Sequence, residues 1–423
     1  MRVDIDGNPF GYRPASAVSP STGTRRFHGS LWSEIGSRIE LASTAVGHCL
    51  EDSHGLTRVI CIGVQRTIQL VRFGYRTALL ATVITGYDVV VLTGGSFFRG
   101  RDLPLLHRLG KRIVVIFTGS DHRPPFLNGK YQTSSSDEIV AETKRIYRFV
   151  GLAERYATAI VAASSSAQFH RRPFVHFLAL GIPFAPSETK PLGGTVFTGT
   201  GLRILHCPTH LTGKGTDTVR AIIEGLRREG LAIDYVEMVD RPNHEVLAAL
   251  AECDFAIDEL LSDSPLARFA TEAAWFGKPA LSAGEYAREI VHDLPASLIP
   301  PSTFVPPEQV GDVIQRFATD ADYRIGQGRN VQDFVRDQWN PRAVASRFLE
   351  ILDGAAPSEW IYDPARLTYI GGWGLGPREW RRSVGAALEN AGVESLGLSE
   401  ALIARILARL GEEPLDDAAR SET

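Results

Sequence analysis

Residues 258–279, DELLSDSPLARFATEAAWFGKP, decide the fold class of this sequence. They follow the apolar run 255–257, which predicts a buried strand, and they end in Gly-Lys-Pro, which predicts the end of a helix. A strand followed at once by a helix is typical of a parallel sheet. Glu272 is then expected in the first turns of a helix that starts at the carboxyl edge of that sheet, where ligands bind in open α/β folds.

Length and composition indicate an ordinary globular protein with more than one domain. The 423 residues exceed what one hydrophobic core usually organises, and 44% hydrophobic and 22% charged residues are typical globular values. A net charge of −4 argues against a nucleic-acid-binding protein, since no basic excess is available to neutralise phosphates.

Cysteine and histidine usage argues against disulfides and metal sites. The four cysteines are far apart without C-x-x-C spacing, and the eleven histidines show no spacing typical of metal ligands. No apolar segment marks a signal peptide, and no stretch approaches the ~20 apolar residues of a membrane span. We therefore expect a soluble, cytoplasmic protein without a bound metal or cofactor.

Two series of alternating strands and helices run along the chain, separated by a linker rich in Pro, Gly and Thr at 186–201. In the first series, strands are expected at 58–64, 87–92, 112–117 and 159–163, and helices at 31–46, 68–83, 103–109 and 138–152. In the second series, strands are expected at 202–207, 233–239, 255–257 and 279–282, and helices at 216–229, 244–253, 310–318 and 341–352. Apolar runs without alternation, separated by helices, predict parallel sheets covered on both faces.

The predicted fold is therefore α/β with two Rossmann-like domains, residues 1–190 and 191–355. A C-terminal extension, residues 356–423, differs in composition: it has three tryptophans, a glycine-rich run at 371–376 and a helical pattern at 399–410. We expect this helical appendage to cover one domain or to mediate a homodimer contact. Its tryptophans are expected to pack a small core rather than to form a platform for a sugar.

The loop that opens the second domain has residues suited to a diphosphate. Gly213 and Gly215 would let backbone amides approach a ligand closely, and Lys214 brings an ammonium to the start of the next helix. Thr209 lies in the same loop and is included among the predicted substrate-binding residues. The alternative is an ordinary strand–helix turn with a solvated lysine.

Glu272 is the second candidate ligand. A carboxylate at this edge of the sheet can accept hydrogen bonds from both hydroxyls of a ribose, as the acidic residue of dinucleotide sites does. The alternative is a glutamate that stabilises its helix through the helix dipole, by ~0.3–1 kcal/mol.

Together and in this order, the two segments resemble retaining glycosyltransferases of the GT-B type, in particular glycosyltransferase family 4. Lys214-Gly215 matches the Lys-Gly segment with which that family binds the donor diphosphate. Residues 272–279, EAAWFGKP, match the family's E-A-x-x-x-G-K-P helix, so Glu272 is implied as the ribose ligand. The resemblance spans roughly residues 57–353. It implies two domains facing a cleft, a nucleoside diphosphate sugar (UDP or GDP) as donor, and no metal.

The sequence departs from the family pattern at three places. The arginine that usually accompanies the lysine of the diphosphate loop is missing, with His206 and His210 nearby instead. Ser264 stands where many members have a glutamate near the donor sugar, and Thr118 stands where they often have a basic or imidazole side chain. Asp258 and Glu259 end the same strand and are candidates to replace the missing carboxylate.

The loop after the third strand of the first series is the candidate acceptor site. Asp121 or His122 could orient an acceptor hydroxyl, and Arg123 could bind a phosphate or carboxylate, with Gly119 also contributing to substrate binding. The alternative is an aspartate that caps the following turn, beside an exposed histidine. We assign Asp121, His122 and Glu259 to catalysis.

These assignments predict a metal-independent, retaining glycosyltransferase that moves a sugar from a nucleoside diphosphate sugar to an acceptor hydroxyl. The acceptor is a glycan, a lipid-linked intermediate or a small natural product. One alternative is a catalytically inactive, glycosyltransferase-like subunit that binds a nucleotide or glycan in a biosynthetic complex, as Ser264 and Thr118 indicate. A GT-B epimerase or phosphorylase is another, although the sequence has no segment resembling the lysine-bound cofactor site of a phosphorylase.

Overall fold

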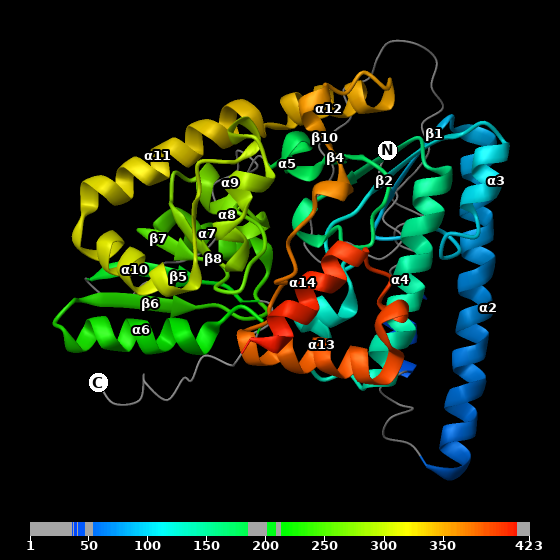
Figure 1. The fold of residues 1–423 in the computed structure, drawn as a ribbon, viewed down its shortest axis with the longest axis horizontal. Helices are drawn as coiled ribbons and strands as arrows, with labels where there is room; N and C mark the ends of the chain where they lie inside the picture. Colours follow the sequence, from blue (N-terminus) through cyan, green and yellow to red (C-terminus); the bar gives the residue numbers. More distant parts are fainter. Residues whose placement is uncertain are drawn as a thin grey trace. The chain divides into compact units, whose positions relative to one another are not determined.

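The computed structural model of the protein describes residues 36, 38–39, 41–46, 54–184, 201–208 and 213–412 (Figure 1). Their strands form two five-stranded sheets, in the orders β1-β2-β3-β4-β10 and β6-β5-β7-β8-β9. By compactness the chain divides into two units. Unit 1 holds the residues up to Val114 together with Tyr156–Thr158, and unit 2 holds Val115–Arg155 and Ala159–Thr423.

The first sheet is built by short apolar strands. Its strands are β1 (Val89–Thr93), β2 (Arg112–Ile116), β3 (Ala159–Ala162), β4 (Phe174–His176) and β10 (Ile361–Tyr362). The helices in this part of the chain are α2 (Gly55–Gly86), α3 (Leu103–Arg108), α4 (Ser136–Tyr156) and α5 (Phe177–Leu180). β3 pairs with β4 in parallel, and β10 pairs with β4 in the antiparallel direction.

One expected strand of the first series is wrong. Residues 58–64 do not form a strand but belong to α2, the same helix that contains the expected helix 68–83. Periodicity cannot separate a strand from a helix in so short an apolar run. In the helix, Cys61 is buried whereas Val59 and Ile60 are exposed. The expected helix at 31–46 lies partly outside the described residues.

The second sheet is entirely parallel, as predicted. Its strands are β5 (Leu202–His206), β6 (Ile233–Glu237), β7 (Phe255–Ile257), β8 (Ala280–Ala283) and β9 (Thr303–Val305). Its helices are α6 (Thr216–Arg228), α7 (Asn243–Glu252), α8 (Arg268–Trp275), α9 (Ile290–Asp293), α10 (Val310–Thr319), α11 (Ala321–Gln338) and α12 (Pro341–Leu352). Buried side chains from β5, β7, β8, α6 and α10 form one core, which includes Ile204, Val219, Phe255, Ile314 and Phe317.

The strand order locates a ligand site in the second sheet. The chain starts at β5, passes to β6 on one side, and then crosses to β7 on the other side of β5. The point where the direction of winding reverses therefore lies between β5 and β7. In open parallel sheets, ligands bind beyond the carboxyl ends of the two strands at such a point, because the loops there diverge.

Helix α11 was not expected from the sequence, since its segment is polar and contains Gly326 and Gly328. Gly328 has a packing role. A Cβ atom at this position would lie 2.1 Å from the carbonyl oxygen of Gly277, so only glycine lets α11 approach the end of α8 this closely.

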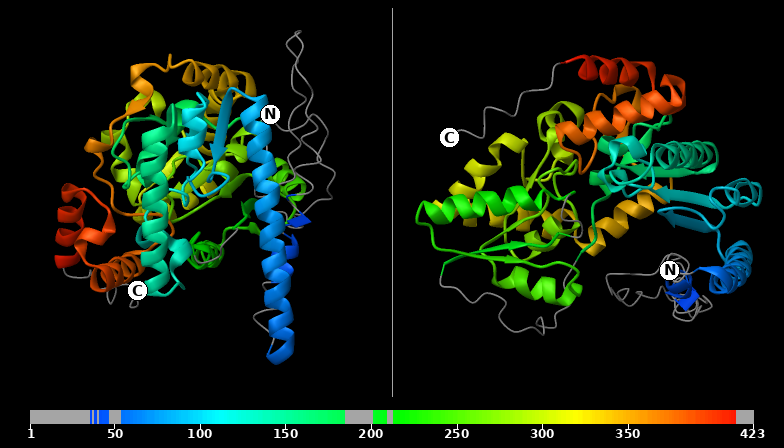
Figure 2. Two further views of the ribbon diagram at one scale, coloured as in Figure 1. Left: turned by 90° about the vertical axis from the view of Figure 1, so that its right-hand side faces the viewer. Right: turned by 90° about the horizontal axis from the view of Figure 1, so that it is seen from below.

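The C-terminal part adds more than helices. After the antiparallel edge strand β10, the chain forms α13 (Pro377–Ala391) and α14 (Glu400–Gly411), which lie side by side (Figures 1 and 2). Arg381 on α13 donates a hydrogen bond to the carbonyl oxygen of Leu410 on α14, and the guanidinium of Arg409 stacks on the ring of Trp380.

The predicted fold class is confirmed: the chain is α/β with two parallel-sheet domains and a helical C-terminal appendage. The predicted boundaries at 190 and 355 stay predictions, and the first of them lies outside the described residues. Among the described helices, none is long and apolar enough to cross a membrane.

Candidate functional site

An ion cluster lies at the reversal point of the second sheet. Lys214 follows β5, and Asp258 and Glu259 follow β7. The Nζ atom of Lys214 lies 3.1 Å from Oδ1 of Asp258 and 2.8 Å from Oε1 of Glu259. All three side chains are buried, and together one ammonium and two carboxylates leave one excess negative charge when all are ionised.

Backbone and side-chain contacts hold the two loops together. The buried ring of His206 contacts the carbonyl oxygen of Ile257 through Nδ1 (2.8 Å) and the hydroxyl of Thr216 through Nε2 (3.0 Å). The amide of Leu260 donates to the carbonyl oxygen of Lys214 (3.1 Å). Gly215 has φ +70°, and a Cβ atom there would lie 2.8 Å from Cβ of Leu260, so the turn requires glycine.

Burial and mutual attraction set the protonation of the cluster. Burial alone would lower the pKa of Lys214, but the two carboxylates outweigh burial and raise it. Burial raises the pKa of Asp258 to about 6, against the attraction of Lys214. For Glu259, burial is outweighed by Lys214 and by hydrogen-bond donors that include Trp373, so its pKa is lowered. Lys214 and Glu259 therefore stay ionised at neutral pH, while Asp258 is the carboxylate of the cluster that gains a proton first.

A segment of the C-terminal extension covers this cluster. We call residues 371–376, GGWGLG, the glycine strap. Nε1 of Trp373 donates to Oε2 of Glu259 over 2.9 Å, which leaves the other carboxylate oxygen for Lys214. A Cβ atom on Gly213 would lie 3.4 Å from the Trp373 ring, so the indole rests directly on the predicted diphosphate loop.

The glycine strap is also paired with the loop that follows β2. The amide of Trp373 donates to the carbonyl oxygen of Leu127 (3.1 Å), and the amide of Gly129 donates to the carbonyl oxygen of Trp373 (2.7 Å). On the other side, the amide of Gly374 donates to the carbonyl oxygen of Leu261 (2.8 Å). The strap therefore joins a loop of the first sheet to the loop after β7.

A buried ion pair makes a second connection between the same two loops. Arg123, predicted to bind an acceptor anion, pairs with Asp263, and both side chains are only 6% exposed. Burial raises the pKa of Asp263, and the Arg123 guanidinium opposes that change. In this structure the guanidinium is thus neutralised by the chain itself.

The other predicted acceptor-side residues organise their own loop. The Asp121 carboxylate accepts hydrogen bonds from the amides of Thr118 and Gly119, both at 2.9 Å, so its partners precede it in the chain and do not belong to the following turn. His122 is fully buried rather than exposed. Its Nδ1 lies 3.1 Å from Nε2 of His170 and its Nε2 lies 3.0 Å from the hydroxyl of Ser166. Burial, followed by the neighbouring His170 and Arg123 side chains, lowers the pKa of His122 well below its usual value, so the ring is neutral.

Glu272 lies on α8 and is buried, 3% exposed. Its carboxylate accepts hydrogen bonds from the side-chain amide of Asn243 (3.3 Å) and from Nε of Arg268 (3.4 Å). Ser264 is half-buried, and its amide donates to the hydroxyl of Ser262. Thr209 lies outside the described residues.

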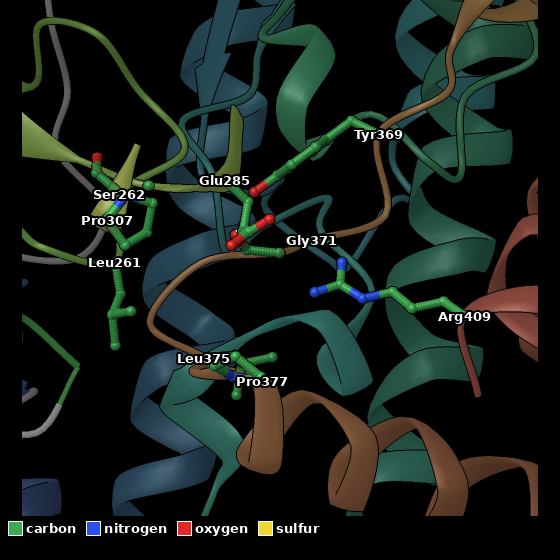
Figure 3. A pocket seen from close by; sticks show the side chains of 11 residues that line it. Leu261, Ser262, Glu285, Pro307, Tyr369, Gly371, Leu375, Pro377 and Arg409 are labelled. Atoms are coloured by element: carbon green, nitrogen blue, oxygen red, sulfur yellow. Dashed lines mark hydrogen bonds between the residues drawn. The ribbon is translucent and has the colours of Figure 1, made fainter. Parts of the chain in front are cut away.

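A cavity of about 90 Å³ lies beside the glycine strap (Figure 3). The side chains of Tyr369 and Arg409 point toward Glu285 across it. Its lining consists of Leu261, Ser262, Gly284, Glu285, Pro307, Tyr369, Gly371, Gly372, Leu375, Pro377 and Arg409. Among the described residues, no group of His, Cys, Asp and Glu side chains could hold a metal ion.

Sequence reasoning missed two residues of this site, Asp263 and Trp373. Asp263 gave no signal, because its partner Arg123 is 140 residues away in the chain. Trp373 did give one. Glycines on both sides of a tryptophan indicate a backbone that approaches another segment closely, and the strap makes such an approach.

No protein-family model and no curated protein matches this sequence. Among solved structures, the chain is similar to Anabaena HepE in complex with UDP-glucose, with 14% identity, 75% of this chain and 96% of that chain covered, and a TM-score of 0.40. It is similar to the catalytic domain of Starch Synthase IV from Arabidopsis thaliana bound to ADP and acarbose (11% identity, 67% and 76% covered, TM-score 0.44). It is also similar to WaaG, a glycosyltransferase involved in lipopolysaccharide biosynthesis (12% identity, 61% and 82% covered, TM-score 0.41). At these identities and TM-scores, residue roles rest on the geometry of this chain alone.

Proposed function

We propose that this protein is a glycosyltransferase of the GT-B type that transfers a sugar from a nucleoside diphosphate sugar to an acceptor hydroxyl. The observation that carries the proposal is the position of Lys214. Its ammonium lies at the reversal point of a parallel sheet, one residue before Gly215 and the start of α6. A lysine and helix-terminal amides at this point favour a diphosphate.

In the proposed reaction, Lys214 and the amides at the start of α6 stabilise the negative charge that develops on the leaving diphosphate. Glu272 accepts hydrogen bonds from the ribose hydroxyls. Retention at the anomeric carbon and independence of a metal follow from the resemblance to glycosyltransferase family 4, and belong to the proposal.

The two carboxylates beside Lys214 set a condition on donor binding. A diphosphate and the carboxylates compete for the same ammonium, so the donor has to take Lys214 over from Asp258 and Glu259. Protonation of Asp258 reduces that competition. Glu259 then remains as the carboxylate near the donor sugar, a role that Ser264 cannot fill.

The proposal is tested by thermal unfolding in the presence of UDP-, GDP-, ADP- and dTDP-sugars. Specific binding raises the unfolding temperature by mass action. We expect one nucleotide to stabilise the wild type, and Lys214→Met to abolish that stabilisation. The matched control is Lys144→Met on the exposed face of α4, which should respond as the wild type does. No stabilisation of the wild type by any nucleotide would overturn the proposal.

Glu272 offers an internal check on the nucleotide's orientation. If its carboxylate binds the ribose, the wild type should bind UDP more tightly than 2′-deoxy-UDP. In Glu272→Ala this preference should disappear, because the variant loses affinity for UDP, which has both ribose hydroxyls, and much less affinity for 2′-deoxy-UDP. Isothermal titration calorimetry with the two nucleotides measures the ratio, and an unchanged ratio contradicts the assignment.

An inactive nucleotide-binding subunit is the second candidate. The full neutralisation of Lys214 by its own carboxylates, together with Ser264, favours it. The two candidates differ in donor hydrolysis. An active enzyme releases the nucleoside diphosphate slowly without acceptor, whereas the inactive subunit binds the donor and leaves it intact.

A further inference from the structure

The glycine strap is a closely fitted part of the site rather than a loose cover. A Cβ atom on Gly129 would lie 2.3 Å from the carbonyl oxygen of Gly374, and one on Gly372, at φ +79°, would lie 2.3 Å from that of Leu127. These distances are far below van der Waals contact, so the two segments meet through their backbones. These backbone contacts fix the position of the glycine strap, and with it the position of Trp373.

The strap is anchored behind Trp373 by a second tryptophan. Nε1 of Trp380, on α13, donates to the carbonyl oxygen of Ile370 over 2.7 Å, and Trp380 is only 2% exposed. Trp373 itself is half-buried, and its Nε1 donates not to the backbone but to the Glu259 carboxylate. The two indoles thus differ in role: one fastens the chain, and the other contacts the ion cluster.

A continuous chain of contacts runs from Trp373 to Lys214. The indole N–H holds Oε2 of Glu259, and Oε1 of Glu259 holds the ammonium of Lys214. If the indole N–H is lost, Glu259 keeps Lys214 as its main partner. The carboxylate is then a stronger competitor for the ammonium that a diphosphate would need.

We propose that Trp373 is a positioning residue of the donor site. The C-terminal extension completes this site, because the Trp373 N–H holds Glu259 and so leaves the Lys214 ammonium available to bind a diphosphate. The inference rests on the proposed function, because Lys214 acts in it as the diphosphate ligand. It gives the extension a role in the site, whereas the sequence indicated an appendage that covers one domain or mediates a homodimer contact.

The variant Trp373→Phe tests the inference, since it keeps an aromatic side chain but removes the N–H donor together with part of the indole ring. UDP, and the nucleotide that stabilises the wild type most, are the probes. We expect Trp373→Phe to raise their Kd about tenfold, the size expected for one charged hydrogen bond. The matched control, Trp380→Phe, also loses an indole N–H hydrogen bond, in this case the one to the carbonyl oxygen of Ile370. It should lower the unfolding temperature without a comparable change in Kd.

A second readout follows the contact without any assay of activity. In ¹⁵N spectra of the six tryptophan indoles, the resonance missing from Trp373→Phe identifies the Trp373 N–H. It should shift as Glu259 titrates, and this titration should vanish in Glu259→Gln. It should also shift when the nucleotide binds, because Lys214 then leaves Glu259.

The outcomes separate this inference from the proposed function. If no nucleotide binds the wild type, the proposed function fails and this inference fails with it. If a nucleotide binds, but the Trp373 resonance and the Kd of Trp373→Phe stay unchanged, only the role of Trp373 is overturned. A fall in affinity in Trp380→Phe equal to that in Trp373→Phe would show a structural effect of the extension and would also overturn it.

Discussion

At the scale of single residues, the diphosphate loop depends on a backbone conformation rather than on side chains alone. Gly215 has a left-handed φ and faces Leu260, and the next residue begins α6. Its neighbour Lys214 can lie between Asp258 and Glu259 because the chain turns sharply here. The sequence predicted that Gly213 and Gly215 let backbone amides approach a ligand, which stays a prediction; the structure gives Gly215 a further reason, its positive φ beside Leu260.

We expect Gly215→Ala to lower the free energy of unfolding by about 2 kcal/mol, since the new Cβ atom meets Leu260 and the residue is held at positive φ. Gly225, inside α6, is a matched control, because a Cβ atom there meets nothing within 4 Å. Gly225→Ala should raise the free energy of unfolding by about 0.5–1 kcal/mol. Urea unfolding measures both, and equal effects of the two variants would contradict the explanation.

At the scale of elements, two loops from different sheets meet beside the ion cluster, one after β2 and one after β7. The sequence located both as segments that follow buried strands. It did not show that they meet. The Arg123–Asp263 ion pair and the glycine strap bring them together, and both contacts join residues more than a hundred positions apart.

Removing one partner of the Arg123–Asp263 pair should lower the free energy of unfolding strongly, whereas replacing both partners with apolar residues should lower it little. Arg123→Met leaves Asp263 buried without its partner, so we expect a loss of about 3–5 kcal/mol in the free energy of unfolding. The double variant Arg123→Met/Asp263→Leu should recover most of that loss. Arg145→Met, which breaks the exposed pair with Glu142, is the control and should cost less than about 1 kcal/mol. A single and a double variant of equal stability would contradict this account.

At the scale of the whole molecule, one carboxylate connects three distant segments of unit 2. Asp293 accepts hydrogen bonds from the hydroxyls of Ser164 after β3 (2.6 Å), Tyr286 after β8 (2.5 Å) and Tyr362 on β10 (2.5 Å). The extension therefore shares a polar network with segments that follow strands of both sheets, all of them in unit 2.

Asp293→Ala should remove the acceptor of all three hydroxyls and lower the free energy of unfolding by about 3 kcal/mol or more. Tyr362→Phe removes one bond of the network and should cost about 1 kcal/mol. Because the network spans both sheets and the extension, we expect near-UV and far-UV circular dichroism to report one transition for unit 2. Separate transitions for the two sheets in the wild type would contradict the shared network.

The sequence by itself determined the features that depend on neighbouring residues. Hydrophobic periodicity and Gly/Pro signals act over a few positions, so seven of the strands, most helices, and the loops of Lys214 and Glu259 could be predicted. The short strands β4 and β9 were missed, because three residues are too few to show a pattern. The segment 58–64 and helix α11 could not, because a short apolar run and a polar, glycine-containing run are ambiguous locally. Tertiary structure alone decided the strand order, the neutralisation of Lys214, the burial of His122 and the contact of Trp373 with Glu259. Burial and charge pairing act through space, and no local pattern records which distant residue will supply the partner.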